Sequence, residues 1–308
     1  MPLPATIRTA VAFLALGAML GGCAASRHSV EMPKNVSFYN VGHRGTRGLM
    51  PENTIPAFEK GIEVGANTIE FDVHITKDNK VVVYHDDSFT PSYTTMPDGS
   101  DIPQADRKKY TFYQMNYPDI RKFIIGKKYY PAFPHQHLQA TYAPLLSEMI
   151  DSVESFTARE HYPPVIYLLE VKSSAQSDGF AQPDPETFMK TMMTVLKPYL
   201  KGLRGRLIIQ SFDARPLKII HRDYPRIPIG FLTGDGQLDT HIAQLGFTPA
   251  YYNPQFGAVT PELLKACHEK GIKVLPWTVE DVKDMRRLKA MGVDGIITDY
   301  PDRVRDLK

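Results

Sequence analysis

Cysteine and long hydrophobic runs are both scarce in this sequence of 308 residues. Two cysteines, Cys23 and Cys267, are too few for a scaffold built on disulfides. The apolar run at residues 9–20 has 12 residues, whereas a membrane-spanning helix needs about 20. An excess of one charge is also absent, with 36 basic against 34 acidic side chains. Because nucleic-acid-binding domains usually show a strong basic excess, nucleic acid is not an expected partner.

The apolar run near the N-terminus ends in Leu20-Gly21-Gly22-Cys23. Its length is typical of a signal-peptide core, and these four residues resemble the lipobox of bacterial lipoproteins, whose cysteine is acylated. We therefore expect a signal peptide at residues 1–22, an anchor and linker at residues 23–38, and a membrane partner reached through a lipid on Cys23. The expected location is the bacterial cell envelope, as a periplasmic or outer-membrane lipoprotein. The alternative is an ordinary cleaved signal with an incidental cysteine, which the small residues before a lone cysteine disfavour.

Short apolar segments alternate with helical patterns from residue 39 to the end of the chain. Segments of this kind, bounded by Gly, Pro or Asp, are typical of buried parallel strands. Eight of them alternating with helices predict an α/β fold, a single (β/α)8 TIM barrel over residues 39–308. The expected strands lie at residues 40–43, 68–73, 165–171, 207–211, 228–232, 250–253, 273–278 and 295–299.

Two segments interrupt the alternation. Residues 81–85 form a ninth strand-like run, too close to the strand at 68–73 for a parallel crossover, so the two runs should form a hairpin. Residues 92–140 are rich in Tyr, Pro and Lys, show weak periodicity and are too long for a plain barrel loop. They predict an insertion after this second-strand hairpin, packed over one end of the barrel.

Carboxylates stand at the ends of two expected strands. Glu70 and Asp72 are two residues apart, so both point to one face, here the barrel interior. Buried together they repel and require a cation, and Ca²⁺ or Mg²⁺ suits oxygen ligands. The segment Glu170-Val171-Lys172 would add a third carboxylate and a lysine on one face. Exposed acidic ends and a surface Glu–Lys pair are the alternatives, which the apolar residues before each site disfavour.

The first expected strand ends in Gly42-His43-Arg44-Gly45. Active sites of (β/α)8 barrels lie at the C-terminal ends of the strands. A histidine can carry a proton there, and an adjacent arginine offers a fork for phosphate oxygens. The flanking glycines would allow a ligand to approach the backbone closely.

The hairpin brings a second histidine to the same place. A turn centred between Asp78 and Asn79 pairs residues whose numbers sum to 157, which sets His85 opposite Asp72, with a tolerance of about one residue. Asp86 would then provide another carboxylate nearby. A histidine at a strand end is more often structural than catalytic, and this position beside the carboxylates is what favours catalysis.

Together these residues form a set suited to metal-assisted phosphoryl transfer, in which positioning and charge neutralisation dominate. The motifs are His43-Arg44-Gly45, Pro51-Glu52-Asn53-Thr54, Glu70-Phe71-Asp72, His85-Asp86, Glu170-Val171-Lys172, Gln210-Ser211-Phe212, Trp277-Thr278-Val279 and the segment 294–301. In order and spacing they resemble the glycerophosphodiester phosphodiesterase family, from about residue 39 to the end. That family also carries an insertion after its second histidine.

The resemblance implies a role for each residue of the catalytic centre. His43 and His85 would be the acid–base pair, one deprotonating the nucleophile and the other protonating the leaving alkoxide. Glu70, Asp72 and Glu170 would bind the divalent cation, Ca²⁺ or Mg²⁺. The reaction would pass through a cyclic phosphate formed by the glycerol 2-hydroxyl. Its products would be glycerol phosphate and an alcohol such as choline or ethanolamine.

The resemblance also implies substrate-binding residues. Arg44 and Lys172 would hold the phosphate, and Glu52 would support the site, although a carboxylate favoured by a helix dipole is the simpler interpretation of Glu52. Trp277 would line the glycerol side of the pocket, or else serve as an ordinary core residue. Gln210 would contact substrate or close a layer of the barrel.

One residue departs from the family pattern, and two other functions stay open. Glu280 stands where the family often has Asn, and it could face the pocket and affect the choice of headgroup.

A lysophospholipase D or another lipid phosphodiesterase is the nearest alternative function, which a wide apolar mouth would favour. A binding lipoprotein without catalysis is disfavoured because no member of the proposed set is missing. The oligomeric state is not predicted.

Overall fold

The computed structural model describes residues 1–2, 29–305 and 307. The expected signal peptide and Cys23 therefore lie almost wholly outside the described residues, and the prediction of a lipoprotein stays a prediction. Among the residues that are described, no helix is both long enough and apolar enough to cross a membrane.

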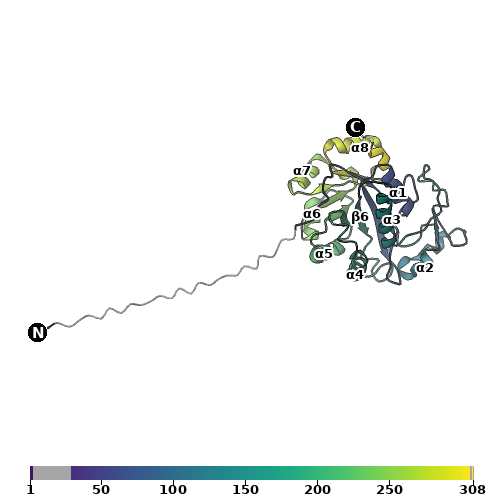
Figure 1. Ribbon diagram of the computed structural model, residues 1–308, viewed down its shortest axis with the longest axis horizontal. Coiled ribbons are helices and arrows are strands. Elements are labelled where there is room, and N and C mark those ends of the chain that lie inside the picture. Colours follow the sequence, from purple (N-terminus) through teal and green to yellow (C-terminus); the bar gives the residue numbers. More distant parts are fainter. Residues whose placement is uncertain (3–28, 306, 308) are drawn as a thin grey trace.

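Parallel strands form a nearly closed barrel surrounded by helices (Figure 1). Within the described part of the chain eight strands follow one another around the barrel, in the order β10, β9, β8, β7, β6, β2, β1 and β11. This confirms the predicted (β/α)8 barrel. The strands are β1 (Tyr39–Gly42), β2 (Thr68–Ile75), β6 (Ile166–Val171), β7 (Leu207–Ser211), β8 (Ile229–Thr233), β9 (Tyr251–Pro254), β10 (Lys273–Val274) and β11 (Gly295–Thr298).

Helices cover the outside of the barrel, where alternate strand residues form the main hydrophobic core. In β6, for example, Tyr167, Leu169 and Val171 face the helices, which leaves the intervening residues to the barrel interior. The helices are α1 (Ile55–Glu63), α3 (Leu146–Arg159), α4 (Pro185–Leu196), α5 (Ala214–Asp223), α6 (Leu238–Leu245), α7 (Pro261–Glu269), α8 (Val282–Met291) and α9 (Pro301–Arg305), with the short η3 (Phe256–Ala258).

The barrel closes irregularly between β10 and β11. The strand expected at residues 273–278 ends at Val274, because Pro276 lacks a backbone N–H and cannot continue the ladder. Hydrogen bonds still join the two edges, from Asp294 N to Val274 O at 3.1 Å and from Ile297 N to Pro276 O at 3.0 Å.

The barrel interior is apolar at the N-terminal ends of the strands and charged at the other end. Residues such as Ile166 and Leu168 fill the lower interior. Met32 and Val36, which precede β1, pack against this inner cluster. Further along β6, Glu170 replaces the apolar residues, so charge is concentrated at the C-terminal ends.

The predicted hairpin forms between β2 and β3 (Val81–Val83), with a register one residue from the expected one. Val73 pairs with Val83 and Ile75 with Val81, so paired numbers sum to 156, not 157. The cause is the turn, which is closed by a bond from Thr76 N to Lys80 O. Asn79 takes a left-handed conformation there, with φ of 56°. Turn type therefore sets the register.

The segment between β3 and α3 builds a second, smaller core beside the barrel (Figure 1). Its centre includes Tyr84, Phe89, Phe112 and Phe123, with Phe89 stacked on Phe123 at a centroid distance of 4.2 Å. Its elements are β4 (Thr94–Thr95), η1 (Gln104–Tyr110), η2 (Phe112–Gln114), α2 (Tyr117–Ile120) and β5 (Ile124–Ile125), with β4 antiparallel to β5.

Candidate active site

Three buried carboxylates meet at the C-terminal ends of β2 and β6. Glu70 and Asp72 come from β2, and Asp72 pairs in register with Glu170 of β6. One oxygen from each of the three lies within 4.8 Å of the others. Burial, with the charges of Asp72 and Glu170, raises the pKa of Glu70 well above its ordinary value. Burial likewise raises the pKa of Glu170, with Asp72 adding to the effect and Lys172 opposing it.

The donor set fits a hard divalent cation. Its oxygen atoms converge, and Glu70 Oε1 is buried without a hydrogen-bond partner among the described residues. Such an orphaned carboxylate oxygen is costly to bury, and a cation would satisfy it while offsetting the repulsion of the cluster. Oxygen ligands are those that Ca²⁺ and Mg²⁺ prefer. Glu70, Asp72 and Glu170 are therefore the residues that would hold the metal.

Two cations border this carboxylate cluster. Lys172 Nζ lies 2.7 Å from Glu170 Oε1 and 3.5 Å from Asp72 Oδ1. Arg44 donates from Nη1 to Glu52 Oε1 at 2.6 Å, and its Nε lies 3.8 Å from Asp72 Oδ2. Burial alone would raise the pKa of Asp72, but Lys172, His85 and Arg44 together hold it far below its usual range. Both cations also line the cavity beside the cluster.

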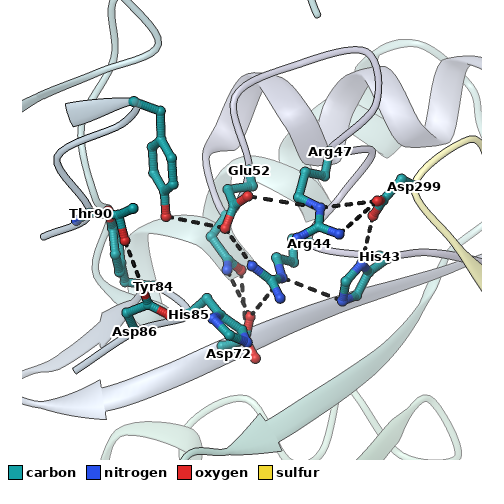
Figure 2. A network of polar contacts seen from close by, with 12 residues as sticks. His43, Arg44, Arg47, Glu52, Asp72, Tyr84, His85, Asp86, Thr90 and Asp299 are labelled. Carbon is teal, nitrogen blue, oxygen red and sulfur yellow. Dashed lines mark hydrogen bonds and ion pairs between the residues drawn. The ribbon is translucent and has the colours of Figure 1, made fainter. Parts of the chain in front are cut away.

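His43 is held by a carboxylate at the end of β11. Its Nδ1 lies 2.6 Å from Asp299 Oδ1, and its Nε2 accepts a 3.3 Å hydrogen bond from Arg44 Nε. Arg47 donates to the other oxygen of Asp299 from Nε and Nη2, at 3.0 and 2.8 Å (Figure 2). Burial lowers the pKa of His43 to about 4, although Asp299 opposes the change. The lowered pKa favours the neutral imidazole, whose Nε2 accepts the hydrogen bond from Arg44.

His85 reaches the same site although the hairpin register differs from the expected one. The chain leaves β3 at Val83 and bends, and His85 then lines the cavity together with Glu70 and Glu170. Its Nδ1 lies 2.6 Å from Asp86 Oδ1 (Figure 2). Asp86 is fixed in turn by hydrogen bonds from Thr90 Oγ1 and Arg107 Nη2, at 2.7 and 2.8 Å. The base of the insertion therefore orients this histidine.

Glu52 and Asn53 hold the site from the loop before α1. Glu52 Oε1 accepts hydrogen bonds from Arg44 Nη1 and from Tyr93 Oη, the latter at 3.2 Å, and so fixes the position of the arginine (Figure 2). Asn53 donates to Asp72 Oδ2 at 2.8 Å. Arg44 and Asn53 both take left-handed conformations, with φ of 51° and 55°. Such backbone strain is kept only where surrounding contacts determine it, often at functional sites.

The glycines around His43 serve the turn itself. A Cβ on Gly42 would lie 2.0 Å from Gly45 O, and one on Gly45 would lie 2.6 Å from the backbone of Ala57. Only glycine therefore allows the chain to fold against α1 here. These close approaches are between parts of the chain itself, and the expected approach of a ligand to this backbone stays a prediction.

Two adjoining hollows open from the carboxylate cluster. The smaller, of about 120 Å³, is lined in part by Trp277 and Gln210. Trp277 Nε1 donates to Asn253 O at 2.8 Å, and its ring meets Phe212 edge-on. The larger, of about 340 Å³, is lined mostly by polar and charged residue types, together with Val171 and Phe212. Its lining includes Asp86, Asp87, Arg107, Ser173, Ser174, Ser177 and Gln182, and it shares His85, Glu170, Lys172 and Phe212 with the smaller one.

All nine predicted site residues meet here, and others join them that carried no predicted role. Asp299, Arg47 and Asn53 were the functional contacts missed. Asp299 ends a predicted barrel strand, a position that could have marked it, whereas Arg47 has no sequence signal of its own. Glu280 does not face the cavity. Its Oε1 accepts from Asp299 N at 3.2 Å, so the departure from the family pattern lies behind His43.

A (β/α)8 barrel with buried carboxylates and two carboxylate-bound histidines at its C-terminal end defines a class of metal-assisted hydrolases. The model of the glycerophosphoryl diester phosphodiesterase family matches residues 43–303. A glycerophosphodiester phosphodiesterase from Caldanaerobacter subterraneus subsp. tengcongensis is 30% identical over 267 residues, covering 87% of this chain and 96% of the relative. The chain therefore belongs to the glycerophosphoryl diester phosphodiesterase family and is an enzyme of that class.

Solved structures give the same picture. A family member from Silicibacter pomeroyi is 30% identical, covers 89% of this chain and 93% of its own, and superposes with a TM-score of 0.76. A phosphodiesterase from Oleispira antarctica, solved with its product sn-glycerol-3-phosphate, shares the fold with a TM-score of 0.66 at 20% identity, over 86% of this chain and 94% of its own.

Proposed function

We propose that this protein hydrolyses small glycerophosphodiesters to glycerol phosphate and an alcohol, with His43 as the general base and His85 as the general acid. The observation that carries the proposal is the pair of carboxylate-bound histidines beside one carboxylate cluster, where Asp299 holds His43 and Asp86 holds His85. A divalent cation held by Glu70, Asp72 and Glu170 would supply Lewis-acid stabilisation of charge on the phosphoryl oxygens.

His43 suits the base. Its Nε2 accepts a hydrogen bond from Arg44 Nε, so that nitrogen carries the lone pair, and Nδ1 donates to Asp299. When the substrate hydroxyl replaces Arg44 Nε at this lone pair, Nε2 takes the proton of the glycerol 2-hydroxyl as the hydroxyl oxygen bonds to phosphorus. Asp299 then stabilises the imidazolium that forms.

His85 suits the acid because it borders the larger, polar hollow as well as the phosphate cavity. As the bond from phosphorus to the departing alcohol breaks, His85 gives that oxygen a proton. Water then opens the cyclic phosphate, with the two histidines in exchanged roles. Arg44 and Lys172 neutralise the phosphate during both steps.

We further propose that the mature chain begins at Cys23 as a lipoprotein of the bacterial cell envelope, periplasmic or outer-membrane. The support is the sequence resemblance of residues 20–23 to a lipobox. Mass spectrometry of the purified chain would detect the lipid on Cys23.

The acid and base roles separate when the leaving group is changed. His85→Ala should lower turnover of glycerophosphocholine by about 10²- to 10⁴-fold. It should barely affect the release of p-nitrophenol in the first turnover of the ester with that leaving group, since this alcohol departs without a proton and His85 acts as the base only in the later opening of the cyclic phosphate. His43→Ala should lose both reactions. His221→Ala, an exposed histidine of α5, serves as the control and should change neither. Equal losses on both esters for His85→Ala would contradict its role as the acid.

A further inference from the structure

A cationic groove of about 870 Å³ lies at the N-terminal end of the barrel, opposite the active site. It is formed where α4 leads into β7 and where α5 leads into β8, just before Leu207 and Ile229 begin their strands. Five exposed cationic side chains and two acidic ones line it. They are Lys197, Lys201, Arg204, Arg222 and Arg226, with Glu31 and Asp223.

The charge of this groove is only partly neutralised. Arg204 lies 2.8 Å from Glu31, and Arg222 pairs with Asp223 and with Glu186 of α4. Lys197 and Lys201 form no ion pair with the described residues. An exposed surface of net positive charge attracts anionic lipid headgroups.

The N-terminal segment enters the fold at this same groove. Glu31 N donates to Arg226 O at 2.8 Å, and its carboxylate contacts Arg204. Met32 then continues toward the inner cluster that seals the barrel. Cys23 is eight residues before Glu31, a span of at most about 29 Å at full extension. A lipid on Cys23 would therefore keep the groove close to the membrane.

We propose that the cationic groove is the surface that rests on anionic lipid headgroups, so that the active site opens toward water and receives water-soluble phosphodiesters. The proposal rests on the proposed function and on the acylation of Cys23. Strand direction sets the geometry, since the groove lies at the N-terminal ends of β7 and β8 and the carboxylates at the C-terminal ends of β2 and β6.

The lining of the larger hollow agrees with this orientation. The cations of that lining are paired, Arg107 with Asp86 and Lys172 with Glu170, so the hollow has no excess of positive charge like that of the groove. Its polar lining suits a small hydrophilic alcohol better than an acyl chain. The opposite orientation would turn the exposed Phe180 and Phe212 toward the bilayer, and it is the outcome that would favour a lipid substrate.

Quenching by lipids with a nitroxide on the headgroup tests the orientation. The acylated full chain is placed in phosphatidylcholine vesicles that contain phosphatidylglycerol, with a fluorophore on Gly202→Cys or on Tyr129→Cys. Gly202 is exposed beside the groove, and Tyr129 is exposed on the insertion. Cys267 is buried and should not react. We expect clearly stronger quenching at position 202. Equal quenching, stronger quenching at 129, or a chain that leaves the vesicles would overturn the proposal.

Charge reversal tests whether the lysines of the groove cause the difference in quenching between the two labels. Lys197→Glu with Lys201→Glu should remove most of the difference between the two labels, as should higher salt or vesicles without phosphatidylglycerol. Lys108→Glu with Lys127→Glu makes the same charge change on the insertion and should leave the difference intact. An unchanged difference after reversal at 197 and 201 would overturn the role of the groove.

Turnover separates this proposal from the proposed function. Both double variants should hydrolyse soluble glycerophosphocholine like the unmodified chain, and vesicle-bound lysophosphatidylcholine should be a poor substrate. A chain that binds vesicles as expected but hydrolyses no phosphodiester would overturn the proposed function alone. Faster turnover of the embedded lysophospholipid would overturn the water-facing orientation.

Discussion

Glu280 does not line the cavity, but it contacts Asp299, the residue that holds His43. Its carboxyl is bound to the backbone of Asp299, whose own side chain holds His43, while its second oxygen is buried without a hydrogen-bond partner among the described residues. Burial, together with the charge of Asp299, raises the pKa of Glu280 from 4.5 to about 7. The folded protein therefore binds a proton here more tightly than the unfolded chain does.

The stability of the protein should depend on pH because of this shift. The free energy of unfolding should fall as the pH rises from about 4.5 to about 7, since in this range the unfolded chain has lost the proton that the folded protein still holds. The decrease levels off above the folded-state pKa. Glu280→Gln removes this dependence and should gain on the order of 1 kcal/mol relative to the unmodified protein between about pH 5 and about pH 8. Urea unfolding at each pH measures it. Glu160→Gln, an exposed control, should show no such gain.

At the scale of single residues, the sequence pattern predicted which side chains gather at the site, but it did not predict most of the hydrogen bonds between them. Glu70, Asp72 and Glu170 could be predicted because strand alternation fixes where their side chains point. The bond between His43 and Asp299 joins residues 256 positions apart, and no local period reports such a contact. The contacts of Arg44 with Glu52 and Asp72 could not be predicted for the same reason, because they depend on the fold of the loop before α1 and not on a local sequence period.

Among the elements that build the site, β2 and its hairpin carry the metal-site residues Glu70 and Asp72 and lead to His85. Because β2 alternates, Ile69, Phe71 and Val73 pack outward while the carboxylates point inward. The barrel order and the hairpin could be predicted from apolar segments and their spacing. The hairpin register could not, because it depended on the left-handed Asn79, which spacing alone does not reveal.

A change in β2 should separate metal binding from stability. Glu70→Gln removes a buried charge that repels Asp72 and Glu170, so the metal-free variant should melt at the same or a higher temperature than the metal-free unmodified protein. Added Ca²⁺ should raise the melting temperature of the unmodified protein and leave that of the variant almost unchanged. Glu63→Gln, on the exposed end of α1, should respond to Ca²⁺ like the unmodified protein. A variant that still gained stability from Ca²⁺ would show that Glu70 is not a ligand.

In the molecule as a whole, the two ends of the barrel differ in chemistry. Apolar residues and the segment before β1 seal the N-terminal end, and the cationic groove surrounds that entry. The carboxylates, the histidines and the polar hollow occupy the other end. This division follows from the strands themselves, whose inward residues change from apolar to charged along the chain direction.

The most direct test of the central claim is the release of glycerol 3-phosphate from glycerophosphocholine by the full chain. It is measured as purified, after EDTA, and after return of Ca²⁺ or Mg²⁺. We predict that release stops with EDTA and returns with one of the two cations. Undiminished release by protein shown to be free of metal would contradict the assignment of Glu70, Asp72 and Glu170 as the ligands of a required cation.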